Sequence, residues 1–390
     1  MLSLLASPLA SHALHLLVLV ATGSLLASLA SALCDAKAAP WLAVLAAAPA
    51  VSVAGGVSTL DPLLLPRGLA LPFELLALRL ALDRRWTAAG CWMALAVAVH
   101  APSGVAGAGA LAALGMRDKG SVGWLLPVVP MAALGVGVEL GQPLVERWDL
   151  LEARLSHHLL PWTFPLRHLV LGAALALLGA RDSRLRPAVL GLVGWALLAG
   201  LLGPLLRVRV LLNLEPWQAL RLVALLALVV GAAGVARRPV TWAPLLAALW
   251  WFAPRATLSP WGDPDELGEL ARSVSIEAPP DAVFLLPPTT PPGFRPLARR
   301  ASVGTWKDGG EAQFSAESAA RWERVMSTIE PTWLDGPEAP RTKLETAWSA
   351  RTPNERRALA RALGADHLVD RSPFPGATRV GDLWWGAVTP

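Results

Sequence analysis

Long runs of Leu, Ala and Val, separated by short polar connections, fill most of the chain before Pro254. We interpret these runs as helices of a membrane protein. Ten apolar segments cover residues 12–33, 40–57, 68–82, 87–99, 102–115, 121–139, 166–180, 187–206, 218–235 and 240–253. Several are shorter than the ~20 residues that a perpendicular span needs. The short pair 87–99 and 102–115 therefore fits either two spans or a re-entrant helical hairpin.

Basic residues fall in every second connection between these segments. They are Lys37, Arg84, Arg85, Arg117, Lys119, Arg181, Arg184, Arg186, Arg237 and Arg238. Because Lys and Arg stay preferentially in short cytoplasmic loops, we expect these connections inside the cell and both termini outside. Arg207 and Arg209 run against this alternation, since they lie in a connection predicted to be outside.

The pattern changes after Pro254, where short alternating and amphipathic stretches replace the long apolar runs. It predicts helices at 264–275, 315–329 and 353–363, and strands at 282–286, 301–306, 367–370 and 383–388. Thr352 and Glu355 form a capping box at the last helix, which Gly364 ends. The stretch is long enough for a core of its own.

We therefore predict a polytopic α-helical membrane protein with about ten apolar segments and a small C-terminal α/β domain. The predicted parts are a transmembrane helical domain (1–254), a linker (255–263) and an extracytoplasmic α/β domain (264–390). The predicted location is the cell's inner membrane, which the chain crosses several times.

The longest outer connection, residues 141–166, contains Leu144, Trp148, Leu151, Leu155 and Leu159 at helical spacing, with charged residues largely on the other faces. This pattern predicts an amphipathic helix. We predict that this helix lies at the outer membrane interface; the alternative is a helix packed under the soluble domain.

Composition and charge agree with a membrane domain joined to a soluble one. The chain is 54% hydrophobic. Residues 1–255 hold 19 Lys/Arg and 11 Asp/Glu, a balance of +8, whereas residues 256–390 hold 15 and 18, a balance of −3. The positive charge is thus the signature of short cytoplasmic loops. No basic cluster interleaved with aromatics suggests RNA or DNA binding, so we predict no nucleic-acid partner.

The familiar short motifs of enzyme chemistry are missing from the sequence. It contains no phosphate-binding P-loop, no dinucleotide-binding glycine triplet after a strand and no Gly-x-Ser-x-Gly elbow. No set of Cys and His has the spacing of a metal site, so we identify no cofactor ligands, and a divalent metal stays an open possibility. Polar groups in or beside the apolar segments are therefore the main candidates, because they are costly there.

Asp61, His100 and Arg221 are the candidates near the predicted outer face. Asp61 lies in the outer loop with Arg67 and is the candidate general base, although an Asp-Pro turn also explains it. His100 lies near the outer turn between two segments. Arg221, at the outer entrance of the ninth segment with Glu215 and Trp217, suits a phosphate or pyrophosphate clamp, although snorkelling to the interface also explains it.

Two further charges lie inside the third segment, and three more candidates lie in the tail. Arg79 is close enough to the inner end to snorkel, whereas Glu74 is deeper and needs a partner.

In the tail, positive charge gathers with aromatics at Arg295, Arg300 and Lys307, beside Phe294 and Trp306. We interpret these residues as either an anion-binding rim facing the outer membrane surface or a solvated basic edge.

Four stretches resemble GT-C glycosyltransferases, particularly the bacterial branch with a trailing α/β domain. They are residues 66–70 (PRGLA), residues 97–102 (VAVHAP), residues 214–217 (LEPW) with Arg221, and residues 278–288 (APPDAVFLLPP) followed by Phe294-Arg295, Arg300 and Trp306-Lys307. Ala101 separates the His-Pro pair of the second stretch, and the third has Glu for Gln and a longer gap to Arg221. The likeness covers most of the chain, the motifs are short, and the tail is the most specific.

The resemblance implies transfer of a sugar from a polyprenyl-phosphate carrier at the outer face. His100, Arg221, Arg295, Arg300 and Lys307 would then contact the carrier phosphate or the acceptor. Such enzymes carry an acidic base or metal ligand in the first outer loop, whereas residues 1–11 here contain no Asp or Glu. We therefore expect that one inward-anchored span with its acidic loop is missing from this chain. Asp61 would be a poor substitute for the acidic residue of that loop.

Two alternatives to an enzyme stay open. The first is a non-catalytic membrane protein of the same build, which binds lipid-linked glycans or assists envelope assembly. The second is a transporter, which is disfavoured because the segments show few paired charges and no repeated halves.

Overall fold

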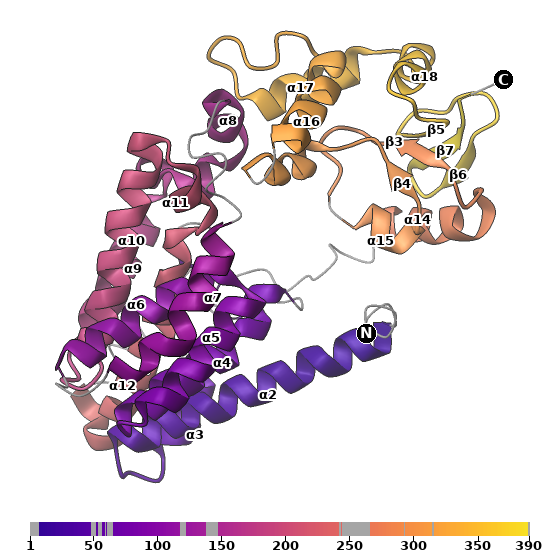
Figure 1. Cartoon of the computed structure of the whole chain (residues 1–390). Coiled ribbons are helices and arrows are strands. Elements are labelled where there is room, and N and C mark those ends of the chain that lie inside the picture. The colour runs from indigo at the N-terminus through magenta and orange to yellow at the C-terminus, as the bar shows by residue number, and fades with distance from the viewer. Residues whose placement is uncertain are drawn as a thin grey trace. The chain divides into compact units, whose positions relative to one another are not determined.

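The structure is a computed structural model that describes residues 8–47, 52–53, 57–58, 60, 65–117, 122–137, 147–241, 243, 266–291, 293–313 and 316–388. Its contacts divide the chain into two units (Figure 1). The helical unit comprises Met1–Val145 and His157–Leu258, and the α/β unit comprises Glu146–Ser156 and Ser259–Pro390. The α/β unit is therefore built from two separate stretches of the chain.

The helical unit is a bundle arranged around α12 (Ala219–Arg237), which is buried along most of its length. The other α-helices of the unit are α2 (Pro8–Leu33), α3 (Ala39–Ala47), α4 (Pro66–Leu82), α5 (Trp86–Val99), α6 (Ala101–Arg117), α7 (Leu125–Gly137), α9 (Leu166–Gly179), α10 (Arg186–Leu206) and α11 (Arg209–Asn213). Short 3₁₀ turns are η2 (Val122–Trp124), η3 (Pro161–Thr163) and η4 (Pro216–Gln218). Helices α2, α3, α9 and α10 pack directly on α12.

Most of the predicted apolar segments are helices, and one prediction is wrong. Segment 40–57 is not a single helix: α3 covers Ala39–Ala47, and β1 (Ser52–Val53) pairs antiparallel with β2 (Val57–Ser58). Valine is β-branched and fits a strand better than a helix, so hydropathy alone misled the prediction. The last predicted segment, 240–253, lies almost wholly outside the described residues.

Three of the described helices are long and apolar enough to cross a membrane: His12–Leu33, Arg186–Leu206 and Arg209–Arg237. A fourth is counted if the bent pair Trp148–Thr163 and Leu166–Gly179 forms one span. Helices α5 and α6 are shorter and pack against each other, as either version of the predicted pair requires. The predicted count of about ten spans stays a prediction.

Several helices of this unit expose large apolar side chains. On α2, Leu16 and Leu17 are each 63% exposed, and on α9 and α10 Leu177 is 73% and Leu190 is 58% exposed. Scattered apolar residues are normal on a water-exposed surface, but rows of them on long apolar helices are typical of contact with lipid tails. This exposure indicates a membrane protein.

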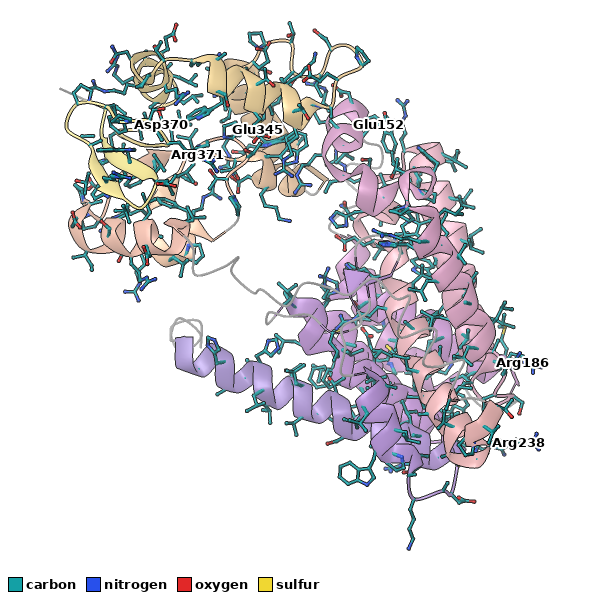
Figure 2. All side chains as sticks on the ribbon, turned by 180° about the vertical axis from the view of Figure 1, so that it is seen from behind. Glu152, Arg186, Arg238, Glu345, Asp370 and Arg371 are labelled. Carbon is teal, nitrogen blue, oxygen red and sulfur yellow. The ribbon has the colours of Figure 1, made fainter. Side chains whose placement is uncertain are left out.

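Basic residues from connections predicted to be cytoplasmic meet at one end of the helical unit. The Arg184 guanidinium donates to the carbonyls of Ala32 (2.6 Å) and Leu33 (2.7 Å) at the end of α2. Arg237, at the end of α12, also donates to the Leu33 carbonyl. Figure 2 shows Arg186 and Arg238 at this same end. The basic connections thus share one end, as the alternation requires, while the side of the membrane stays a prediction.

The α/β unit is built on a five-stranded mixed sheet of order β4-β3-β5-β7-β6. Its strands are β3 (Val283–Leu285), β4 (Ala301–Ser302), β5 (His367–Asp370), β6 (Thr378–Val380) and β7 (Leu383–Ala387), and its helices are α14 (Glu266–Glu277), α15 (Phe294–Ala298), α16 (Ala316–Ile329), α17 (Pro340–Ala350), α18 (Pro353–Ala362) and the 3₁₀ helix η5 (Trp306–Gln313). Strand β3 is parallel to β4 and β5, whereas β7 is antiparallel to β5 and β6. Phe284, Phe294 and Trp385 pack in its core.

Local signals in the tail are confirmed where they are strong. Thr352 and Glu355 form the predicted capping box of α18, and Gly364 follows that helix with a φ of +75°. Sequence analysis missed α15, α17 and β6. Helix α17 buries only Leu344 and Trp348, so its apolar pattern is too sparse to detect.

Helix α8 (Trp148–Leu159) corrects the predicted placement of the amphipathic helix at the membrane interface. Arg147 pairs with Glu323 of α16. Arg154 is 5% exposed and donates to the Trp306 carbonyl at 2.8 Å. The polar face of α8 is therefore engaged inside the α/β unit, and the second placement, packing with the soluble domain, is the one observed.

Candidate functional site

His100 lies at the break between α5 and α6, in an extended conformation (φ −154°, ψ 95°). The two helices approach very closely just after it. A Cβ built on Gly104 would lie 2.4 Å from the backbone nitrogen of Val97 and 2.5 Å from its Cα. Only glycine fits this approach, which brings the first turn of α6 against the end of α5 and places Ser103 beside His100.

A chain of hydrogen bonds connects His100 to the entrance of α12. His100 Nδ1 lies 2.9 Å from Ser103 Oγ, and Ser103 Oγ donates to Gln218 Oε1 at 3.2 Å. Gln218 in turn donates through Nε2 to the Glu215 carboxylate. Ser103 and Gln218 are buried, at 7% and 5% exposure. The chain therefore joins residues that are more than a hundred positions apart in sequence.

The directions of the bonds at Gln218 follow from its partners. A carboxylate only accepts, so the Gln218 amide must turn its NH₂ to Glu215 and its oxygen to Ser103. Ser103 has one hydroxyl proton, which it gives to Gln218. The Ser103 backbone N–H also donates to His100 Nδ1 at 3.3 Å. His100 is therefore held through Nδ1 at the first turn of α6.

Glu215, at the far end of the chain, has an unusual backbone. Its φ of 39° and ψ of 59° place it in the left-handed region, which few residues other than glycine adopt. Such a conformation persists only where the surroundings enforce it, and it is enriched at functional sites. Pro216 and Trp217, directly after it, are buried, and the Trp217 indole donates to the Leu159 carbonyl at 3.3 Å.

Arg221 and Glu74 form a buried pair of opposite charges near the same place. Each is 4% exposed. Arg221 donates to the Arg67 carbonyl at 3.0 Å and interacts electrostatically with the Glu74 carboxylate. Glu74 Oε1 is buried and has no hydrogen-bond partner among the described residues. Arg221 follows Gln218 by three positions, so both project from the same face at the start of α12.

This cluster, formed by Glu74, His100, Ser103, Glu215, Gln218 and Arg221, is called the helical-unit polar cluster below. It combines an imidazole with a guanidinium and its fork of donors. Both groups suit an anionic oxygen, such as that of a phosphate. Buried polar groups are costly in a unit with so apolar a core, which supports a functional role for the cluster.

His100 and Arg221 are both candidates from the sequence, and Gln218, three positions before Arg221, connects to His100 through Ser103. Ser103 and Gln218 were not among the predicted site residues. A usable signal existed, because each is a polar residue at the edge of an apolar segment and needs a partner there. Asp61, the candidate base, lies outside the described residues. Among the described residues, no group of three or more His, Cys, Asp or Glu side chains is arranged to hold a metal ion.

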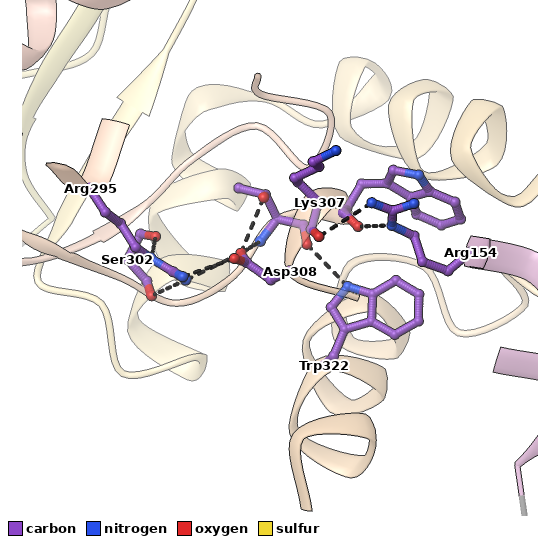
Figure 3. Close-up of polar contacts among 8 residues, drawn as sticks. Arg154, Arg295, Ser302, Lys307, Asp308 and Trp322 are labelled. Carbon is purple, nitrogen blue, oxygen red and sulfur yellow. Dashed lines mark hydrogen bonds and ion pairs between the residues drawn. The ribbon is translucent and has the colours of Figure 1, made fainter. Parts of the chain in front are cut away.

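In the α/β unit, Arg295 lies in a dense polar network (Figure 3). Its guanidinium donates to Ser302 Oγ at 2.7 Å and to Asp308 at 2.8 and 3.2 Å. Asp308 also accepts from the backbone nitrogen of Thr305 at 2.6 Å. Arg295 lines a pocket of about 330 Å³, together with Ser302, Val303, Gly304, Asp308, Ser318, Arg321 and Trp322.

Arg300 and Lys307, the other two tail candidates, lie outside the lining of this pocket. The Arg300 guanidinium donates to the carbonyls of Ser275 (3.2 Å) and Ala278 (2.5 Å) at the end of α14. The Lys307 carbonyl accepts from Arg154 at 3.4 Å (Figure 3). Burial and the nearby charge of Arg341 lower the pKa of Arg154, which Asp308 partly opposes. Arg300 thus supports the fold of the unit, and the three residues do not line one pocket.

Comparison with known proteins gives few matches. Residues 265–329 match a family described as a domain of unknown function, DUF6798. No curated protein matches significantly. Among solved structures, the chain is similar to a cryo-EM structure of the arabinofuranosyltransferase AftD from Mycobacteria, with 18% identity and a TM-score of 0.43. The match covers 95% of this chain but 29% of the other. A similarity this low assigns neither a fold nor a substrate.

Proposed function

We propose that this chain is a GT-C-like membrane glycosyltransferase that binds a polyprenyl-phosphate-linked sugar through its helical unit. The helical-unit polar cluster carries the proposal. His100 and Arg221 were selected from short motifs similar to those of GT-C enzymes, and in the structure they belong to one cluster whose groups suit a phosphate.

In this proposal Arg221 neutralises the carrier phosphate, and Glu74 holds the guanidinium in place within the bundle. The hydrogen-bond chain from Glu215 through Gln218 and Ser103 orients His100, so that Nε2 faces the ligand. The imidazole can then form a hydrogen bond to a phosphate oxygen. Asp61, in the predicted outer loop, is the proposed base that activates the acceptor hydroxyl.

The test is binding of a short-chain polyprenyl monophosphate hexose to the full-length protein in lipid nanodiscs. Arg221→Lys keeps the charge but removes the fork, so we expect about tenfold weaker binding, which corresponds to the loss of one charge-assisted hydrogen bond. His100→Gln should weaken binding by a similar factor, because it removes the imidazole nitrogen that would contact the phosphate.

Arg184→Lys is a matched control. Arg184 also donates to backbone carbonyls at a helix end, but at the basic end of the unit. The Arg184→Lys variant should leave carrier binding unchanged. Thermal unfolding should be compared between Arg184→Lys and Arg221→Lys. Absence of binding by the wild-type protein, or equal affinity in Arg221→Lys and Arg184→Lys, would refute the proposal. Transfer of the sugar to an acceptor separates an enzyme from a carrier-binding protein.

A further inference from the structure

A second polar pocket lies in the α/β unit, apart from the residues selected by sequence analysis. It has a volume of about 440 Å³, within the range of small-molecule sites. Its lining includes Pro287–Pro291 after β3, Asp370–Ser372 at the end of β5, and Glu345, Trp348 and Ser349 of α17. Figure 2 labels Glu345, Asp370 and Arg371.

The topology of the sheet explains why a pocket forms there. Strands β3 and β5 are parallel neighbours, so their carboxyl ends lie at the same edge of the sheet. After β3 the chain turns to β4 on one side, and after β5 it turns to β6 and β7 on the other. Connections that diverge in this way leave a crevice at the carboxyl ends, where ligands of open α/β sheets bind.

Asp370 supplies a buried acceptor at this pocket. It is fully buried (0% exposed), and its Oδ1 accepts from Arg356 and from the backbone nitrogen of Arg371 at 2.7 Å. Its Oδ2 is buried too and has no hydrogen-bond partner among the described residues. A buried carboxylate oxygen without a donor is costly and rare. A ligand hydroxyl would satisfy it.

The charges of the pocket indicate the kind of ligand. Two acidic side chains, Glu345 and Asp370, face two basic ones, Arg356 and Arg371, so the lining carries no net charge. The Arg356 guanidinium is already engaged within the protein, because it pairs with Asp370 and donates to the Trp348 carbonyl at 3.0 Å. Hydroxyls of Thr289, Thr290, Ser349 and Ser372 add donors and acceptors beside three prolines and Trp348.

We propose that this pocket binds a neutral saccharide. A sugar presents many hydroxyls as donors and acceptors, together with apolar C–H faces, and this matches a lining of hydroxyls, a free carboxylate oxygen and prolines. A phosphate or carboxylate ligand would instead need a surplus of positive charge. The proposal is independent of carrier binding by the helical unit, because it rests on different residues.

The test is a binding screen of the full-length protein in nanodiscs against an array of neutral mono- and disaccharide methyl glycosides, with inorganic phosphate and glucuronate as charged comparisons. Ser349 is exposed and lines the pocket, so Ser349→Trp should fill it without disturbing the fold. Thr346→Trp is the matched control, since Thr346 is exposed on the same helix but outside the lining.

We expect saturable binding of at least one neutral glycoside, an at least tenfold loss of affinity in Ser349→Trp, and wild-type affinity in Thr346→Trp. Thermal unfolding of both variants should match the wild type. Absence of glycoside binding by the wild-type protein would overturn the proposal. So would binding of phosphate or glucuronate alone, or equal glycoside affinity in the two tryptophan variants.

Discussion

Arg221 in the helical unit and Arg300 in the α/β unit look alike in the sequence, yet they occupy very different surroundings. Arg221 is 4% exposed among apolar helices and interacts with Glu74 and the Arg67 carbonyl. Arg300 is half-buried and binds the carbonyls that end α14. The first belongs to a cluster suited to a ligand, and the second holds a helix end.

The difference shows that the surroundings decide how much a polar residue reveals. In an apolar segment a charge is costly, so it needs a partner, and its presence alone indicates a site. On the surface of a water-exposed domain an arginine costs little, so a group of arginines in its sequence indicates nothing by itself. The helical-unit polar cluster was therefore partly visible from sequence, whereas the saccharide pocket was not.

The largest expected effect comes from Gly104, whose close approach to Val97 positions Ser103 and His100. Gly104→Ala places a methyl against backbone atoms that cannot move aside. We expect a loss of about 3 kcal/mol, at the upper end for overpacked cores, together with loss of carrier binding. Thermal unfolding in nanodiscs measures the first and the carrier assay the second.

Gly109→Ala is the control for this prediction. It lies on the same helix, and nothing lies within 4 Å of a Cβ built there. It should be neutral or slightly stabilising, because alanine favours a helix over glycine. If both alanine variants behave alike, the close packing of α5 and α6 does not position the site.

The second prediction separates Arg300 from the ligand-binding arginine. Arg300→Ala leaves the carbonyls of Ser275 and Ala278 without their charged donor, which should cost the α/β unit about 2 kcal/mol. Carrier binding should not change. Arg299→Ala, which removes an exposed neighbouring charge, should leave stability within about 0.5 kcal/mol. A loss of carrier affinity in Arg300→Ala would favour the interpretation of Arg295, Arg300 and Lys307 as an anion-binding rim.

The fold was predictable where one local signal dominates. Long apolar runs gave α2, α10 and α12, and the Thr352–Glu355 box gave the start of α18. The prediction failed at β1 and β2, where apolar composition hid strand-forming valines. It also missed α17, which buries just two apolar residues.

The candidate site was predictable only in part, because its geometry comes from contacts distant in sequence. His100 and Arg221 were visible as polar residues beside apolar segments. The bond from Ser103 to Gln218 joins positions 115 apart, and no local pattern reports it. The environment of the Asp370 carboxylate could not be predicted for a similar reason. It depends on Arg356 of α18 and on the connections that leave β3 and β5 in opposite directions.

The third prediction concerns the ion pair between Arg295 and Asp308. The Arg295 guanidinium can either stabilise the fold through Asp308 or bind an anion. Arg295 is 44% exposed, so solvent screens the pair, and a double-mutant cycle with alanine should give a coupling of about 0.5–1 kcal/mol. The coupling should shrink in 1 M salt. A coupling near zero would mean that the guanidinium is available for an anion in its 330 Å³ pocket.

The smallest expected effect concerns the ion pair between Arg147 and Asp149 at the start of α8. The hydrogen bonds from Arg147, at 3.0 and 2.7 Å, lower the pKa of Asp149, which burial partly opposes. Since the folded-state pKa is depressed, the pair stabilises the fold above the ordinary pKa of 3.8. This contribution is lost as pH falls through the folded-state pKa.

Asp149→Asn should therefore lower stability by less than about 1 kcal/mol at pH 7, because the side chain is half exposed. The difference from the wild type should shrink as the pH falls below the ordinary pKa of 3.8 and vanish below the folded-state pKa. Chemical unfolding at pH 7, 5, 4 and 3 measures this, with Glu152→Gln as the control on the same helix. A difference of the same size at pH 7 and at pH 3 would show that the side chain contributes by packing rather than by charge.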